Sequence, residues 1–170
     1  MLEIINNLKL FFEDNYRRIN VREYARLTGI SPPNASKKLS ELEKEGLVKK
    51  EVERKYFYYS ANKSNKVFIE LSRIYWYELL TNSGLIEHLI KELVKPKIIL
   101  FGSLSKAEVR RESDIDLAIF TPSTKELNLK LFEKKIGRDI QIFMFKNKDD
   151  VKSEELINNI RNGFIITGGW

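Results

Sequence analysis

The sequence predicts an α+β fold in three parts: a helical region closed by a hairpin at residues 1–64, a helical segment at residues 65–94, and an αβ domain with a small mixed sheet at residues 95–170. Apolar residues recur at helical spacing in the first two parts, whereas short apolar runs alternate with helical stretches after Pro96. Polar residues 62–65 and the proline mark the breaks, because proline disfavours helix in the residue before it.

Composition narrows the class of protein. Of the 170 residues, 42% are hydrophobic and 32% are charged, as in water-soluble globular domains. The chain has no cysteine, which excludes disulfides and thiolate-bound metals. The apolar runs are shorter than the ~20 residues that span a bilayer, and no export signal is recognisable. We therefore expect a cytoplasmic protein without membrane contact.

The net charge of +6 is distributed unevenly. Residues 1–64 contain 13 Lys and Arg against 9 Asp and Glu. This surplus favours a polyanion partner for the N-terminal region. The alternative is that the charge only keeps the protein soluble, and charge alone does not separate the two.

Helix signals organise the N-terminal region. A first helix is predicted at residues 2–13, followed by a short strand at residues 19–21. Asn20 is the predicted N-cap of a second helix, which Gly29 ends. The apolar stripe of the first helix consists of Leu2, Ile5, Leu8 and Phe12.

A third helix and a hairpin complete this region. Ser31 is the predicted N-cap with Pro32 at the first helical position, and Gly46 stops the helix. Residues 47–61 predict two short strands around a turn at residues 53–55. The buried stripe of the helix is Ala35, Leu39 and Leu42.

The order helix, strand, helix, turn, helix, hairpin resembles the winged helix-turn-helix of bacterial and archaeal regulators, over roughly residues 2–61. The resemblance implies that the third helix meets DNA base edges and that the hairpin reaches phosphates. The alternative is a winged helix that mediates protein contacts only. The candidate DNA-binding residues are Ser31, Asn34, Lys37, Lys38, Arg54 and Lys55.

The segment at residues 65–94 predicts two helical pieces broken near Gly84. Trp76 and Tyr77 widen its apolar surface beyond one stripe, so it is predicted to join the two halves or to form a homodimer contact. His88, the only histidine, is interpreted as structural. The predicted stripe is Val67, Leu71, Ile74, Tyr75 and Leu79.

After Pro96 the pattern is strand, turn, strand, helix, strand, helix. The predicted strands are residues 97–101, 114–120 and 139–145, the helices are residues 125–136 and 148–162, and residues 163–168 form a final strand or turn.

Two carboxylates lie on one face of the second of these strands. Asp114 and Asp116 are separated by one residue, and residues two apart in a strand point to the same side. Oxygen ligands so placed can share a hard cation, and proteins usually hold Mg²⁺ with one or two carboxylates plus phosphate oxygens. The pair is therefore a candidate site for a metal-bound nucleotide.

The preceding turn has chemistry suited to phosphate. Gly102 allows close approach to the backbone, and Ser103 begins a short segment whose N–H groups and hydroxyl could hold phosphate. Lys106, together with Arg110 or Arg111, would neutralise part of a triphosphate.

This combination closely resembles the minimal nucleotidyltransferases of the DNA polymerase β superfamily, over about residues 95–168. The resemblance implies a small αβ fold, Mg²⁺ as cofactor and a nucleoside triphosphate, ATP by expectation, as substrate or ligand. It also implies transfer of a nucleoside monophosphate to a small molecule, a nucleic acid end or a protein. The residues at the family's motif positions are Gly102, Ser103, Ser113, Asp114 and Asp116.

The sequence departs from the family at two places. Lys106-Ala107 stands where the family often has arginine and glycine, and lysine lacks the planar guanidinium fork. The family's third carboxylate, which ligates metal and assists deprotonation of the acceptor, aligns best with Gln141. Asp139, two residues earlier on the same predicted face, is the candidate substitute, so the catalytic candidates are Asp114, Asp116 and Asp139.

Two functions follow from these features. The first is a Mg²⁺-dependent nucleotidyltransferase coupled to a winged helix that binds double-stranded DNA. The alternative is a catalytically degenerate transcriptional regulator or antitoxin that senses a nucleotide or a protein partner.

Overall fold

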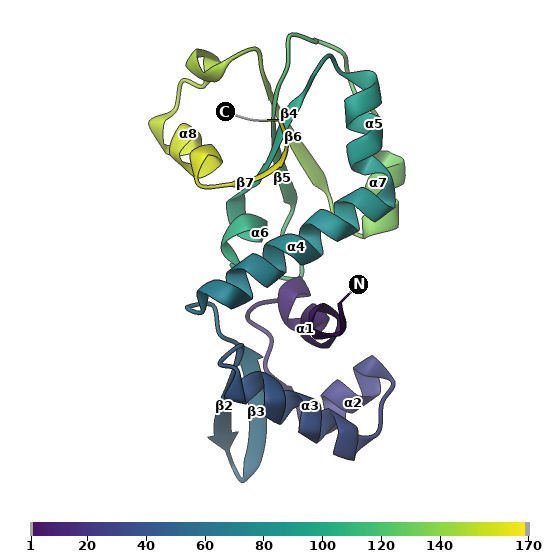
Figure 1. Ribbon diagram of the computed structural model, residues 1–170, viewed down its shortest axis with the longest axis vertical. Helices are drawn as coiled ribbons and strands as arrows, with labels where there is room; N and C mark the ends of the chain where they lie inside the picture. Colours follow the sequence, from purple (N-terminus) through teal and green to yellow (C-terminus); the bar gives the residue numbers. More distant parts are fainter. Residues whose placement is uncertain (1, 169–170) are drawn as a thin grey trace. The chain divides into compact units, whose positions relative to one another are not determined.

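The computed structural model describes residues 2–168 of the chain (Figure 1). It divides the chain into two compact units. The first comprises the residues up to Leu71 together with Ala107–Arg111. The second comprises Ser72–Lys106 together with the residues from Glu112 onward. Eight α-helices and two small sheets make up the described part of the chain, which confirms the predicted α+β class.

The first unit has the predicted order of elements. Its β-sheet has the strand order β1-β3-β2 with both pairs antiparallel. The elements are α1 (Glu3–Glu13), β1 (Ile19–Asn20), α2 (Val21–Thr28), α3 (Pro32–Lys44), β2 (Val48–Glu53) and β3 (Tyr56–Ala61). The Asn20 side chain accepts a bond from the Glu23 N–H at 2.9 Å, and Gly29 ends α2 in the left-handed conformation.

The core of the first unit differs from the predicted stripe at two residues, Leu2 and Phe11. Leu2 is 65% exposed, and Phe11 is buried together with Phe12. Phe11 stacks on Tyr24 with ring centroids 6.4 Å apart, and Phe12 contacts Phe68 at 5.1 Å. Aromatic pairs at these distances add to the free energy of burial.

The segment Ala107–Arg111 is fixed in the first unit by Asn15. The Asn15 N–H donates to the Val109 carbonyl at 2.8 Å, and Asn15 Oδ1 accepts from the Val109 N–H at 2.6 Å. Asn15 Nδ2 also donates to the Phe11 carbonyl. Asn15 and Val109 are both buried, so one side chain satisfies polar groups that would otherwise be costly to remove from water.

Two helices connect this unit to the remainder of the chain. They are α4 (Lys66–Ser83) and α5 (Leu85–Glu92), separated by Gly84 in the left-handed conformation, as predicted. The chain passes from the first unit to the second inside α4. Within residues 2–168, no helix has both the length and the apolar character that a bilayer crossing requires.

The predicted stripe of α4 is wrong at Val67 and Ile74 and is confirmed at Tyr75. Val67 and Ile74 are exposed, while the buried residues are Phe68, Ser72, Tyr75, Trp76 and Leu80. Apolar residues occur on more than one side of this helix, so their spacing alone did not fix which side faces the core.

The second unit is built on a four-stranded mixed sheet in the order β6-β5-β4-β7. Only β5 and β6 are parallel, and the other neighbouring pairs are antiparallel. Its remaining elements are β4 (Lys97–Phe101), α6 (Gly102–Lys106), β5 (Ile115–Phe120), α7 (Lys130–Ile136), β6 (Ile140–Phe145), the 3₁₀ turn η1 (Lys148–Asp150), α8 (Glu154–Arg161) and β7 (Phe164–Thr167).

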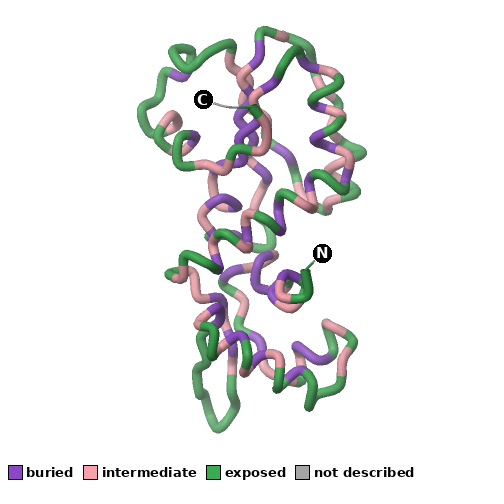
Figure 2. The backbone as a smooth tube through the Cα atoms, in the orientation of Figure 1, coloured by how far each residue is buried: buried purple, intermediate pink, exposed green. Residues whose placement is uncertain are grey.

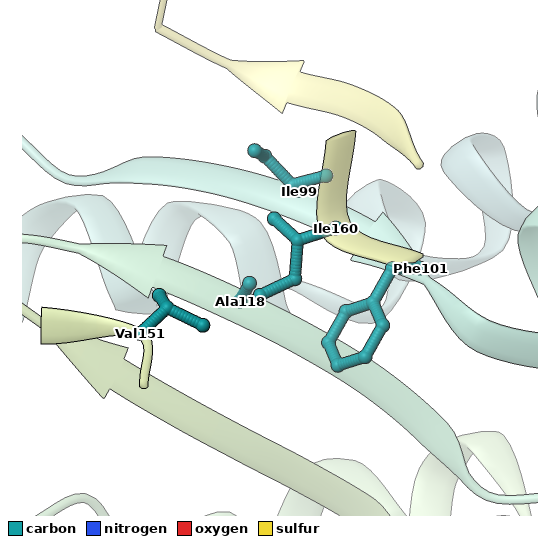
Figure 3. Packing of buried hydrophobic residues seen from close by; sticks show 5 residues of the cluster. All are labelled: Ile99, Phe101, Ala118, Val151 and Ile160. Atoms are coloured by element: carbon teal, nitrogen blue, oxygen red, sulfur yellow. The ribbon is translucent and has the colours of Figure 1, made fainter. Parts of the chain in front are cut away.

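Helices cover both faces of this sheet. Figure 1 shows α8 on one side and α5 and α7 on the other. Ile160 of α8 packs in one cluster with Ile99 and Phe101 of β4, Ala118 of β5 and Val151, which follows η1 (Figure 3). Figure 2 shows that β4 and β5 are the most continuously buried strands, which makes them a rigid support for the residues at their ends.

Two predicted helices are shorter than expected. The helix predicted at residues 125–136 begins only at Lys130, and residues 122–129 are not helical. The helix predicted at residues 148–162 is divided into η1 and α8. Val151 leaves η1 in an extended conformation and enters the core, so tertiary packing interrupts the helical pattern there.

We predict that Asn15→Ala destabilises the protein by roughly 1–3 kcal/mol, because it leaves the buried Val109 N–H without its acceptor. Urea unfolding monitored by circular dichroism would measure the loss. Asn6→Ala is the matched control, since Asn6 is an exposed asparagine of α1. Equal stability of the two variants would contradict the role given to Asn15.

Candidate functional sites

The two aspartates lie where β5 begins. Asp114 immediately precedes β5, and Asp116 is its second residue. In the sheet, Asp116 is paired with Phe101 of β4 on one side and with Gln141 of β6 on the other. The carboxylates therefore lie beside the end of β4, from which α6 continues directly.

Gly102 brings the start of α6 against Asp116. It has a φ of 68°, in the left-handed region, and a Cβ added to it would overlap Asp116 Oδ2 and lie 3.2 Å from Cγ. Glycine is thus required both for the backbone conformation and for the space that the carboxylate occupies. Ser103 follows as the second residue of this short helix.

Burial and charge both act on Asp116. Desolvation raises the pKa of its carboxyl group above the ordinary value, and the neighbouring Asp114 carboxylate raises that pKa further. A cation bound between the two carboxylates would offset both effects. The pair is therefore electrostatically suited to a positive ligand.

Gln141 completes the arrangement on the β6 side. Its Nε2 donates to Asp114 Oδ2 at 2.7 Å, so the side chain at the preferred third-acid position does face the aspartate pair. Asp139 lies just before β6 with an exposed side chain, and its backbone carbonyl accepts from the Ile115 N–H. Among residues 2–168, no three acidic or histidine side chains gather closely enough to hold a metal ion.

Arg138 supports this site and was missed by the sequence analysis. Its Nη1 donates to the Ser113 carbonyl at 2.6 Å, immediately before Asp114, and its guanidinium lies 5.0 Å from the Trp76 ring centroid. The available signal in the sequence was its position directly after Gly137, which ends α7, and just before β6. Stacking on an aromatic ring holds the guanidinium in place.

The cations predicted to meet phosphate have different surroundings. Lys106 Nζ donates to Asn159 Oδ1 of α8 at 2.8 Å. Arg110 belongs to the first unit, where its guanidinium lies 4.2 Å from the Tyr16 ring centroid. Arg111 is exposed.

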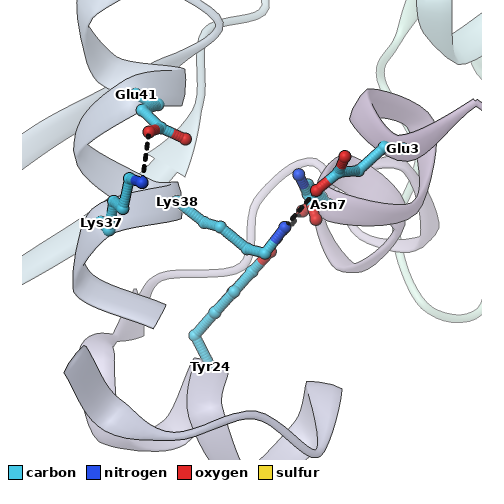
Figure 4. A network of polar contacts seen from close by, with 6 residues as sticks. All are labelled: Glu3, Asn7, Tyr24, Lys37, Lys38 and Glu41. Atoms are coloured by element: carbon cyan, nitrogen blue, oxygen red, sulfur yellow. Dashed lines mark hydrogen bonds and ion pairs between the residues drawn. The ribbon is translucent and has the colours of Figure 1, made fainter. Parts of the chain in front are cut away.

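In the first unit, the candidate DNA-binding residues divide into two groups. Ser31, Asn34 and Lys37 are exposed along the first half of α3. Lys38 instead forms an ion pair with Glu3 of α1 at 2.6 Å, which lowers the pKa of the Glu3 carboxyl group through their hydrogen bond (Figure 4). A DNA contact by Lys38 would require this ion pair to open.

Arg54 and Lys55 form the two-residue turn of the β2–β3 hairpin. Glu53 and Tyr56 are the last paired residues, and both turn residues have positive φ, 47° and 70°. Turns of this kind favour Asn-Gly, and a left-handed conformation costs other residues about 1–2 kcal/mol each. Two exposed cations are thus held at the tip despite an unfavourable backbone.

Comparison with known families gives one match in each part of the chain. Residues 85–163 match the family model described as polymerase beta, nucleotidyltransferase, and residues 13–49 match the model for winged helix-turn-helix DNA-binding. The two matches agree in order and position with the two resemblances found in the sequence. No curated protein and no solved structure matches the chain.

The backbone conformation at Ala107 explains one departure from the nucleotidyltransferase pattern. Ala107 occupies the place of the family's glycine, has a φ of 54° and is buried. The position therefore demands a left-handed conformation, which explains the preference for glycine there. This chain retains the conformation with an alanine.

The residues of the site fit a divalent cation such as the Mg²⁺ that the resemblance implies. Asp114 and Asp116 supply two oxygen donors, which is what Mg²⁺ takes from a protein when phosphate oxygens complete its shell. The pKa of Asp116 is already raised by burial and by Asp114. A neutral amide at Gln141 is a poorer ligand, so the described residues suit a nucleotide-bound ion better than a pair of ions.

We predict that Gly102→Ala destabilises the nucleotidyltransferase domain more than Gly137→Ala. Both glycines have positive φ, but a Cβ at Gly137 would meet no atom within 4 Å, whereas one at Gly102 would overlap Asp116. The additional loss of unfolding free energy in Gly102→Ala is expected to be on the order of 1–3 kcal/mol, as for other overpacked positions. Thermal unfolding would measure it. An equal loss for both variants would show that Asp116 can move aside freely.

Proposed function

We propose that the protein is a DNA-binding nucleotidyltransferase that takes a Mg²⁺-bound nucleoside triphosphate, ATP by expectation, and transfers its nucleoside monophosphate. The acceptor hydroxyl, on a protein, nucleic acid or small molecule, forms a bond to the α-phosphorus, and the bond from that phosphorus to the β-bridging oxygen breaks to release pyrophosphate. The observation that carries this proposal is the packing of Asp116 on Gly102, which places the carboxylates beside the α6 backbone.

In this proposal the chain's own residues position charge. Asp114 and Asp116 would hold the metal ion, which when bound would stabilise negative charge on the phosphates. Gly102 leaves room for the Asp116 carboxylate. The Ser103 hydroxyl would donate a hydrogen bond to a phosphate oxygen. Lys106 would supply positive charge on release from Asn159. Asp139 is the proposed acceptor of the hydroxyl proton, which in its absence would pass to water.

A second candidate function is a regulator or antitoxin that binds nucleotide, or a protein partner, without turnover. The hydrogen bond from Gln141 to Asp114 favours this function, because it places an amide beside the aspartate pair. An amide cannot take the proton from the attacking hydroxyl as a carboxylate can. In this case the nucleotide would act only as a ligand, and the regulatory effect would come from DNA binding by the winged helix.

For DNA, we propose that Ser31, Asn34 and Lys37 of α3 meet base edges in the major groove and that Arg54 and Lys55 contact phosphates. We also propose a homodimer through α4, on which Val67, Ile74 and Tyr77 are exposed. Light scattering that finds only monomer at micromolar concentration would contradict the dimer.

We predict that the wild type transfers label from α-phosphate-labelled ATP to a component of a cell extract in the presence of Mg²⁺. The double variant Asp114→Asn/Asp116→Asn should abolish transfer. Gln141→Glu should increase it by about 10²-fold or more, because a carboxylate beside Asp114 would add a metal ligand and a second proton acceptor besides Asp139.

The variants separate the two candidates. Transfer only by Gln141→Glu, with nucleotide binding by the wild type, would select the regulator. Transfer that is equal in the double variant and the wild type would contradict the proposed site.

We predict that Lys55→Gly stabilises the winged helix by about 1 kcal/mol, because glycine relieves the positive φ. The same change should weaken duplex DNA binding and reduce its salt dependence by about one phosphate contact. Lys55→Ala is the matched control, since it removes the charge but keeps the strain. Unchanged DNA affinity in both variants would exclude Lys55 from the interface.

A further inference from the structure

A groove of about 630 Å³ lies on the winged-helix unit between the first turns of α2 and the hairpin tip. Its walls combine cations of α2 and the turn with three successive aromatic residues of β3. The residues used below are Arg22, Arg26, Lys55, Tyr56 and Phe57. We propose that this groove binds an unpaired nucleotide of a DNA strand, with the base stacked on Tyr56 and the flanking phosphates beside the cations. The proposal rests on the proposed DNA-binding function and refines it.

The sheet topology creates the groove. Strand β1 pairs with β3 only at Tyr58 and Tyr59, and at Asn20 the chain turns into α2. Tyr56 and Phe57 are paired with β2 but extend beyond the end of β1. The edge of β3 is therefore open beside α2, next to the most exposed part of the hairpin.

The charge of the groove suits phosphates. Arg22 and Arg26 are both exposed and lie four residues apart on α2, so they project from one side of the helix. Lys55 contributes a third cation from the turn, against the single carboxylate of Glu23. A strand that passes through the groove would meet a net positive surface.

The aromatic residues indicate a base rather than a phosphate alone. Tyr56 is 63% exposed and Phe57 is 48% exposed. Lys50 lies 4.1 Å from the Phe57 ring centroid, and Arg18 lies 5.1 Å from that of Tyr58, so cations cover these two rings in part. Tyr56 presents the most exposed ring. Stacking of a base on an aromatic side chain contributes about 1–3 kcal/mol, and it requires a base that is not already stacked in a duplex.

The test is fluorescence anisotropy of the full chain with three labelled DNAs: a duplex, the same duplex with a three-nucleotide bubble, and a single strand. We expect the bubble to bind at least about 5-fold more tightly than the duplex, which corresponds to the lower end of one stacking contact. Tyr56→Ala should remove this preference and leave duplex affinity within about 2-fold. Tyr56→Phe should retain the preference.

Val52→Ala is the matched control, because Val52 is 68% exposed on the same hairpin but does not line the groove. Equal affinity of the wild type for bubble and duplex would overturn the inference while leaving the proposed duplex binding intact. A parallel loss on all DNAs in Tyr56→Ala would also overturn it, since it would mark an ordinary wing contact. Binding to none of the three DNAs would refute the proposed DNA-binding function as well.

Discussion

The close packing of Asp116 on Gly102 is the constraint on which the proposed nucleotide site depends. Strands β4 and β5 are buried and paired in a fixed register, so the carboxylate and the first turn of α6 cannot separate independently. The cost is a partly desolvated acid with a second acid beside it, visible in the raised pKa of Asp116. Strain and unfavourable charge of this kind are maintained where a ligand compensates them. Two neighbouring side chains form hydrogen bonds next to the pair. Arg138 donates to the Ser113 carbonyl, and Gln141 donates to Asp114.

Gln141 is the feature that separates binding from catalysis. It faces the aspartate pair from the third-acid position and offers an amide instead of a carboxylate. The amide preserves the orientation of Asp114, because it donates to one carboxylate oxygen and leaves the other free to ligate. It cannot remove a proton. The proposed binding of a metal-bound nucleotide therefore depends on the two carboxylates, whereas the proposed turnover also depends on a proton acceptor other than Gln141.

Local signals predicted much of this fold. Residues close in sequence determine the caps at Asn20 and Gly29, the break at Gly84 and the strand that begins directly after Asp114. The aspartate pair and the glycine could be read as one site because the family motif links them.

The predictions that were wrong or missing depend on tertiary contacts. The phase of α4 depends on which side meets the core, and α8 is shortened where Val151 is drawn into packing. No sequence pattern links Asn15 to Val109, which are 94 residues apart, although their bonds place Ala107–Arg111 in the winged-helix unit.

The most direct test of the central claim is calorimetric titration of the full chain with a non-hydrolysable ATP analogue, with Mg²⁺ and with EDTA. We expect binding that depends on Mg²⁺, that is weakened at least about 10-fold by Asp116→Asn, as when about 1.4 kcal/mol is lost, and that is unchanged by Asp139→Asn. Binding of equal strength in EDTA, or in Asp116→Asn, would contradict this expectation.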